Sequence, residues 1–262
     1  AVAYSNLAHA HQQMATWEIE HGKSPDLWIG KAIDTSTRSL QVNPNYYQTY
    51  RNLASVYALR AKYELSYGRP APASEALSKA HEALNQAIKA NPDDAETHRV
   101  LASVYALDAE AQLSLNRDPQ EALNRGLQAI QKSILISPND SDSLLLHVQL
   151  LLAMADELAK GGTSPLPILQ QAKGVAARAR DVNAKNALVY LSLGQIARTG
   201  ADWQVSKRKS PEKDIADGRA ALDQALSLNP TLALAMATRG SLFLLAAHAA
   251  PAGLQRKLLA AQ

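Results

Sequence analysis

The chain has 262 residues, of which 47% are hydrophobic, so it is long enough for one or two ordinary domains and too apolar for a disordered chain. Its net charge of +3 comes from scattered basic residues, which disfavours nucleic-acid binding because such proteins usually show a basic stripe. The absence of cysteine excludes disulfides and thiolate metal sites. Aromatic residues contribute only 5%, a composition that favours closely packed helices over a sheet.

The longest apolar stretch, residues 144–155, is interrupted by His147 and Gln149. It is shorter than the roughly 20 apolar residues that a membrane-spanning helix needs, so we predict no membrane insertion. The chain begins at Ala1 without an initiator methionine or a signal-peptide layout. We therefore expect a cytoplasmic fragment of a larger protein.

Two kinds of breaker residue recur along the chain at nearly constant spacing. The nine residues from Leu53 to Ala61 return from Leu101 to Ala109 with eight identities at an offset of 48. An Asn-Pro-like step returns every 46 to 48 residues, beginning at Asn43, Asn91, Ser137, Asn183 and Asn229. A second proline lies about halfway between these steps, at Pro25, Pro72, Pro119, Pro165 and Pro211. This period indicates a repeat architecture in which each unit holds two segments.

The segments between breakers have helical length and an apolar spacing of three and four residues. In chain order, the first segments predict helices over residues 2–21, 46–67, 94–115, 141–160, 186–207 and 232–248. The second segments predict helices over residues 25–42, 72–90, 119–136, 165–182, 211–228 and 251–262. Four of the second helices are expected to begin with a capping side chain directly before proline, at Ser24, Asp118, Ser164 and Ser210. Glu121, three residues after Asp118, completes a capping-box-like arrangement.

Small and bulky residues recur within these helices in a pattern that resembles the tetratricopeptide repeat. The second repeat has small residues at Ala80 and Ala87, the bulky Leu84 between them, and the closing Pro92. The family's Leu-Gly/Ala pair and later tyrosine are matched by Leu53, Ala54 and Tyr57, and by Leu101, Ala102 and Tyr105. The resemblance implies an all-α, right-handed superhelical solenoid of about six antiparallel helix hairpins, in which small residues let helix backbones approach closely.

The resemblance implies one repeat domain over residues 1–262, with repeats over approximately 1–45, 46–93, 94–139, 140–185, 186–231 and 232–262. Each unit is about 12 residues longer than the family's 34, and His147 and Arg239 stand where the family prefers leucine. The long hairpins resemble the arrays that follow the catalytic domain in bacterial serine/threonine protein kinases. This implies a regulatory segment attached to such a kinase, although no kinase motif lies in the chain itself.

No residue pattern that supports catalysis or a cofactor is present. The seven histidines are scattered over different repeats, which argues against a metal site. Gly161-Gly162 is followed by Thr-Ser-Pro and not by the Gly-Lys-Ser/Thr of a phosphate-binding loop, so it predicts a helix C-cap. Neither a nucleophile elbow nor a converging carboxylate pair is visible. We predict a protein that is not an enzyme and holds no metal or cofactor.

In a solenoid of this kind the first helices line the concave side. The family's inward-facing positions predict a partner-binding groove formed by Gln48, Arg51, Ser55, Glu96, Arg99, Ser103, Leu145, Gln149, Leu152, Leu188, Leu191, Gln195 and Arg198. One hypothesis is that Arg51 and Arg99 contact an acidic or C-terminal carboxylate of the partner while the leucines receive apolar side chains. The alternative is that the arginines form internal ion pairs with neighbours such as Glu96.

These observations predict a non-catalytic scaffold or sensor segment that binds a protein or peptide in the groove. A second interpretation is a structural module that self-associates, because end hairpins without polar caps leave apolar surface open to another copy. Neither interpretation involves nucleic acid.

Overall fold

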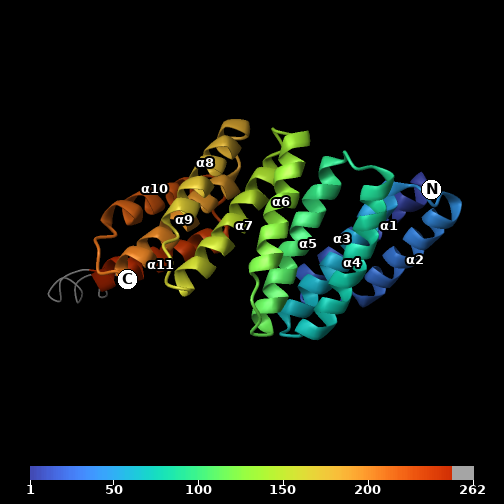
Figure 1. Cartoon of the computed structure of the whole chain (residues 1–262), viewed down its shortest axis with the longest axis horizontal. Helices are drawn as coiled ribbons and strands as arrows, with labels where there is room; N and C mark the ends of the chain where they lie inside the picture. The colour runs from blue at the N-terminus through green and yellow to red at the C-terminus, as the bar shows by residue number, and fades with distance from the viewer. Residues whose placement is uncertain (250–262) are drawn as a thin grey trace. The chain divides into compact units, whose positions relative to one another are not determined.

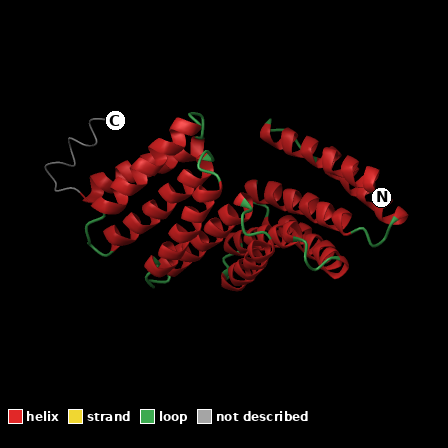
Figure 2. Ribbon diagram, turned by 90° about the horizontal axis from the view of Figure 1, so that it is seen from above, coloured by secondary structure: helices red, strands yellow, loops and turns green. Residues whose placement is uncertain are grey.

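The computed structural model describes residues 1–249, and this part of the chain consists of α-helices joined by short loops, without a strand (Figures 1 and 2). The all-α prediction is therefore confirmed. The helices are α1 (Val2–Glu20), α2 (Asp26–Val42), α3 (Tyr47–Ser66), α4 (Pro70–Ala90), α5 (Ala95–Ser114), α6 (Gln120–Ile136), α7 (Ser141–Lys160), α8 (Leu166–Val182), α9 (Ala187–Ser206), α10 (Glu212–Leu228) and α11 (Ala233–Ala249).

The chain divides into two compact units, Ala1–Pro138 and Asn139–Gln262, which we call unit 1 and unit 2. Unit 1 holds α1 to α6, and unit 2 holds α7 to α11. The helix predicted over residues 251–262 lies outside the described residues. The assignment of residues 1–262 to one repeat domain stays a prediction.

Within each unit, consecutive helices pair as hairpins and the hairpins stack on one another. The hairpins pair α1 with α2, α3 with α4, α5 with α6, α7 with α8, and α9 with α10. First helices also contact each other, α1 with α3 and α3 with α5 in unit 1, and α7 with α9 and α9 with α11 in unit 2. Each unit therefore has a layer made of first helices alone.

The second helices begin as the prolines predict. Pro25 has the helical φ of −81°, and its carbonyl accepts the first helical hydrogen bond from the Ile29 N–H at 2.9 Å. The Oγ of Ser24 accepts from the Asp26 N–H at 3.3 Å, and Oδ1 of Asp118 accepts from the Gln120 N–H at 2.9 Å. These bonds satisfy backbone donors that the first turn cannot pair internally.

Two details of the predicted helix starts are wrong. Helix α4 begins at Pro70, two residues before Pro72, because a proline in the first turn lacks only an N–H that the helix does not use there. The carboxylate of Glu121 does not close a capping box with Asp118. Instead it pairs with Arg125 one turn further along α6, at 2.6 Å.

Each complete first helix ends in a residue with left-handed backbone conformation. These residues are Gly22, Gly68, Asn116, Gly162 and Arg208, with φ between 54° and 78°. In each case the next residue's N–H reaches the carbonyl five positions back, as from Lys209 to Gln204 at 2.8 Å. This pattern is the Schellman motif, and it confirms the C-cap predicted at Gly161-Gly162.

The backbone conformation of Arg208 costs roughly 1–2 kcal/mol for a residue with a side chain. Arg208→Gly should therefore raise the free energy of unfolding by roughly 0.5–1 kcal/mol after the entropy of the glycine is subtracted. Urea denaturation followed by circular dichroism measures the change. Arg208→Ala is the matched control, since it removes the same side chain without relieving the backbone, and an equal gain in that variant would contradict the explanation.

Small residues set the distance between packed helices in unit 2. A Cβ on Gly218 of α10 would lie 2.7 Å from Cδ1 of Leu242 and 3.0 Å from the Cβ of Ala197. A Cβ on Gly194 of α9 would lie 2.5 Å from Cγ of Leu222. Leu222 and Leu242 are fully buried, so neither has space to move away. Both glycines are therefore required for close approach.

Gly218→Ala should lower the free energy of unfolding by roughly 1–3 kcal/mol because the added methyl overpacks the contact between α9, α10 and α11. The control is Gly174→Ala in α8, where a Cβ would meet nothing within 4 Å. That change should raise stability by roughly 0.5–1 kcal/mol, since alanine favours a helix interior. Urea denaturation of both variants tests the pair, and shifts in the same direction would refute the close-approach argument.

Candidate partner-binding face

The predicted groove residues all lie on first helices. In unit 1, α3 carries Gln48, Arg51 and Ser55, and α5 carries Glu96, Arg99 and Ser103. In unit 2, α7 carries Leu145, Gln149 and Leu152, and α9 carries Leu188, Leu191, Gln195 and Arg198. Because α3 contacts α5 and α7 contacts α9, the fold brings each pair of sets together within its own unit. We call the side of each unit on which these positions lie the first-helix face.

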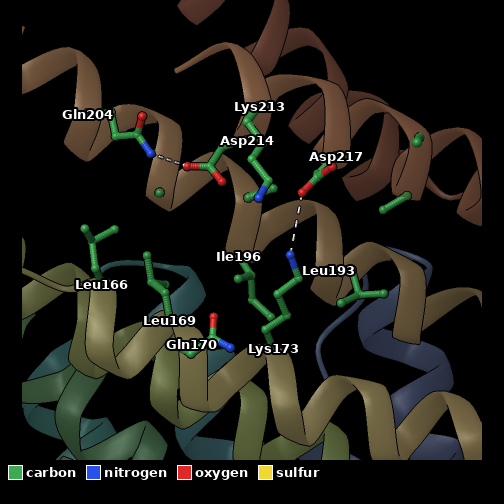
Figure 3. A pocket seen from close by; sticks show the side chains of 14 residues that line it. Leu166, Leu169, Gln170, Lys173, Leu193, Ile196, Gln204, Lys213, Asp214 and Asp217 are labelled. Carbon is green, nitrogen blue, oxygen red and sulfur yellow. Dashed lines mark hydrogen bonds and ion pairs between the residues drawn. The ribbon is translucent and has the colours of Figure 1, made fainter. Parts of the chain in front are cut away.

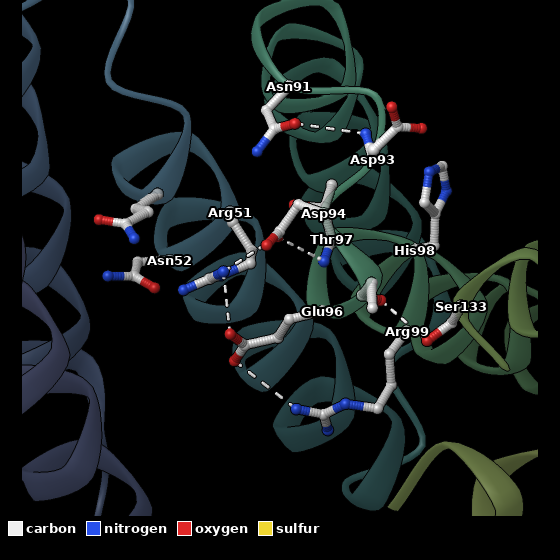
Figure 4. A network of polar contacts seen from close by, with 12 residues as sticks. Arg51, Asn52, Asn91, Asp93, Asp94, Glu96, Thr97, His98, Arg99 and Ser133 are labelled. Carbon is white, nitrogen blue, oxygen red and sulfur yellow. Dashed lines mark hydrogen bonds and ion pairs between the residues drawn. The ribbon is translucent and has the colours of Figure 1, made fainter. Parts of the chain in front are cut away.

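A charged network joins α3 to α5 on the first-helix face of unit 1 (Figure 4). The guanidinium of Arg51 lies 3.0 Å from Oδ2 of Asp94 and 2.9 Å from Oε2 of Glu96. Glu96 also pairs with Arg99, at 3.6 Å. The side chain of Arg51 is only 13% exposed, whereas Glu96 is 50% exposed. Arg51 therefore forms the internal ion pairs that the sequence left as an alternative, and its charge holds α3 and α5 together.

Asp94 connects this network to the start of α5. Its Oδ2 accepts from the backbone N–H of Thr97 at 2.9 Å and from the Thr97 hydroxyl at 2.6 Å. Burial by itself raises the pKa of Asp94, but the hydrogen bonds from Thr97 and Arg51, together with the Arg51 charge, outweigh it and hold this pKa below its usual value. The carboxylate is therefore stabilised in its charged form.

The folded-state pKa of Asp94 is lowered, so its charged carboxylate stabilises the fold fully at pH values above the ordinary aspartate pKa of about 3.9. This stabilisation is lost as the pH falls through the lowered folded-state pKa. Asp94→Asn, which keeps a capping side chain, should cost roughly 1–2 kcal/mol at pH 7. The difference from wild type should vanish in acid. Asp93→Asn, at the exposed neighbouring residue, serves as the control in urea denaturation at both pH values. A pH-independent difference at Asp94 would contradict the electrostatic origin.

The apolar part of the predicted groove is mostly covered. Leu145, Leu152 and Leu191 are between 5% and 9% exposed, and Leu191 belongs to a core cluster with Leu222. Leu188, at the start of α9, is 47% exposed and Gln149 is also exposed. Sequence reasoning placed the three leucines in the groove from their repeat position alone, and the structure packs them inside. The accessible face of unit 2 is therefore polar with one exposed leucine.

Helix α7 also carries the buried His147 and the half-buried Asp156, neither of which belongs to the predicted groove. Both ring nitrogens of His147 are buried without a hydrogen-bond partner, and burial, followed by the charge of Arg178, lowers its pKa. Burial raises the pKa of Asp156, whose Oδ1 accepts from the Thr199 hydroxyl at 3.4 Å. The departure of His147 from the leucine of the resembled family was a usable signal, whereas nothing local marked Asp156 as half-buried.

Within residues 1–249, histidine and acidic side chains do not gather in threes in a way that would hold a metal ion. No helix in this part of the chain combines the length and apolarity that crossing a membrane requires.

Comparison with solved structures identifies the class of fold. The chain is similar to TTC0263, a thermophilic TPR (tetratricopeptide repeat) protein of Thermus thermophilus, with a TM-score of 0.53 and 15% identity over 90% of this chain and 99% of that chain. Two further structures are those of YrrB, described as a TPR protein with an unusual peptide-binding site, and Pseudomonas aeruginosa pilF. For YrrB the TM-score is 0.48, with 14% identity over 88% of this chain and 90% of that chain. For pilF the TM-score is 0.49, with 14% identity over 98% of this chain and 99% of that chain.

No protein-family model matches the sequence, and no curated protein matches it significantly. The likeness to TTC0263 shows the fold, which is that of a tetratricopeptide-repeat protein.

Proposed function

We propose that the chain is a non-catalytic scaffold whose first-helix faces bind an extended peptide segment of another protein. The contact of neighbouring first helices carries this proposal, because it aligns equivalent side chains of successive repeats along one face. On unit 1 that face presents Gln48, Ser55, Glu96, Arg99 and Ser103, whose donors and acceptors suit the backbone of an extended chain.

Arg51 has a positioning role in this proposal. With its guanidinium held between Asp94 and Glu96, it fixes the orientation of Glu96 at the edge of the face. The side chain of Glu96 is half exposed and faces solvent beside Arg99, so the pair offers an acceptor and a donor to the same peptide. The partner is therefore a segment with mixed polar groups, and not a simple acidic tail.

The proposal predicts that panning a library of displayed random peptides against the chain enriches binders that depend on the first-helix face. Arg99→Glu in unit 1 or Leu188→Asp in unit 2 should weaken an enriched peptide by about tenfold or more, since charge reversal or a new charge opposes the contact. Lys132→Glu, at an exposed position of the second helix α6, is the matched control and should leave binding unchanged.

Failure to enrich any peptide, or enriched peptides insensitive to both face variants, would reject this function.

Self-association is the second candidate function, and one observation favours it. Helix α1 exposes Tyr4, Leu7, Met14 and Trp17, each between 39% and 46% exposed. A mass in light scattering that rises with concentration and is held at the monomer value by Leu7→Lys would favour that reading. Attachment to a bacterial serine/threonine kinase stays a prediction from the sequence resemblance.

A further inference from the structure

A pocket of about 580 Å³ lies among α8, α9 and α10 of unit 2 (Figure 3). Its α9 wall includes Ile196 and Gly200, whereas the first-helix face uses Gln195 and Arg198 of the same helix. The pocket is therefore separate from the proposed peptide-binding face. Its volume lies within the range of small-ligand sites, about 300–1,000 Å³. The apolar wall is formed by Leu166, Leu169, Leu193 and Ile196.

Unit 1 has the equivalent pocket, of about 570 Å³, among α4, α5 and α6. The two pockets are related by a shift of 92 residues, so that Tyr105 corresponds to Ala197, Asp108 to Gly200, Gln112 to Gln204, Glu121 to Lys213, Ala122 to Asp214 and Arg125 to Asp217. This correspondence allows the side chains that line the two pockets, and their pairing, to be compared position by position.

In unit 1 the polar groups of the pocket satisfy one another. Nε2 of His81 lies 2.5 Å from Oδ2 of Asp108, and the His81 ring packs against the Tyr105 ring with centroids 4.7 Å apart. Arg125 pairs with Glu121 at 2.6 Å and also hydrogen-bonds to Tyr105. The charged side chains thus have partners on the chain itself, and the site calls for no ligand.

In unit 2 the corresponding substitutions remove two side chains that line the unit 1 pocket and hold its polar network together. Tyr105 is replaced by Ala197 and Asp108 by Gly200, so α9 contributes only a methyl group and a bare backbone there. A carboxylate enters from α10 instead, on Asp214. A Cβ on Gly200 would lie 3.0 Å from Oδ2 of Asp214, so glycine at position 200 leaves room for this carboxylate beside α9.

The charges of the unit 2 pocket are incompletely paired. Oδ2 of Asp214 accepts a hydrogen bond from Nε2 of Gln204 at 2.6 Å, but Asp214 forms no ion pair with any described residue. Burial, followed by the charge of Asp217, raises the pKa of Asp214. The charges of Lys173 and, to a smaller extent, Lys213 act on Asp214 only at longer range, and Lys173 pairs with Asp217 at 3.6 Å. Among the described residues, one carboxylate and one ammonium group therefore border an apolar wall without a close ionic partner.

We propose that this pocket binds a free apolar α-amino acid. The ligand's ammonium group pairs with Asp214, its carboxylate pairs with Lys213, and its side chain packs on Leu166, Leu169, Leu193 and Ile196. A zwitterion with an apolar side chain supplies an ionic partner for each of the two groups and covers the apolar wall, whereas an amine or an acid alone pairs with only one of them. The site goes beyond the proposed peptide-binding function and does not depend on it.

Isothermal titration calorimetry of the chain with L-phenylalanine and L-leucine tests the proposal directly. We expect saturable binding of at least one of them at one site per chain. Phenethylamine, which lacks the carboxylate, and 3-phenylpropionate, which lacks the ammonium group, should each bind about tenfold more weakly or worse. Glycine, which lacks the apolar side chain, should also bind more weakly. No saturable binding of either amino acid, or equal binding of the amine or the acid, would overturn the proposal.

Variants locate the binding in this pocket. Asp214→Asn and Lys213→Gln should each weaken phenylalanine by about tenfold, and Lys213 is exposed, so its replacement does not threaten folding. Ala197→Tyr places on the α9 wall the side chain found at Tyr105 and should weaken phenylalanine binding, because the ring takes space beside the apolar wall. Glu121→Gln, at the position of unit 1 that corresponds to Lys213, is the control and should change nothing. Unchanged affinity for phenylalanine in both Asp214→Asn and Lys213→Gln would refute the site. Peptide binding by the first-helix face is measured separately on the same variants, so a failure of one proposal is distinguished from a failure of the other.

Discussion

The close approach of helix backbones at small residues is the constraint on which the rest of this structure depends. At Gly218 the space for a Cβ is already taken by Leu242 and Ala197, and at Gly194 it is taken by Leu222. In unit 1 the same role falls to buried alanines, with Ala80 and Ala87 fully covered. Gly194 lets α9 and α10 close as a hairpin, and Gly218 lets Leu242 of α11 pack on that hairpin. Stacked hairpins in turn place first helices side by side. The proposed partner-binding face and the pocket among α8, α9 and α10 both follow from that stacking.

The repeat supplies equivalent positions, and substitutions at those positions decide what each site does. The polar side chains of the unit 1 pocket pair with one another, as His81 does with Asp108 beside Tyr105. In unit 2 the corresponding positions hold Lys173, Gly200 and Ala197, and the pocket of similar volume is lined by Asp214 without an ion pair among the described residues. The structure therefore offers two surfaces of different chemistry, a polar face on the first helices and an apolar pocket bordered by charge among α8, α9 and α10. The proposed peptide and amino acid ligands follow this difference.

Much of the fold was predictable because its signals are local. Prolines lacking an N–H, capping side chains such as Asp118, and left-handed residues such as Gly162 determine where helices begin and end within a few residues of chain. The predicted bounds accordingly agree closely with the observed helices, and the exception at Pro70 arose where two prolines compete within one turn. The tetratricopeptide pattern of small and bulky residues indicated the packing partners as well.

The sequence by itself determined the helices, their ends and the repeat register, since each depends on residues close together in the chain. Tertiary structure alone decided which side chains remain accessible and which charges pair. Arg51 meets Asp94 across 43 residues, and Leu145 and Leu191 occupy groove positions by register yet are buried. The carboxylate of Asp214 enters the space that Gly200 leaves on another helix. Such outcomes depend on distances between helices and on side-chain rotamers, which a one-dimensional pattern does not encode.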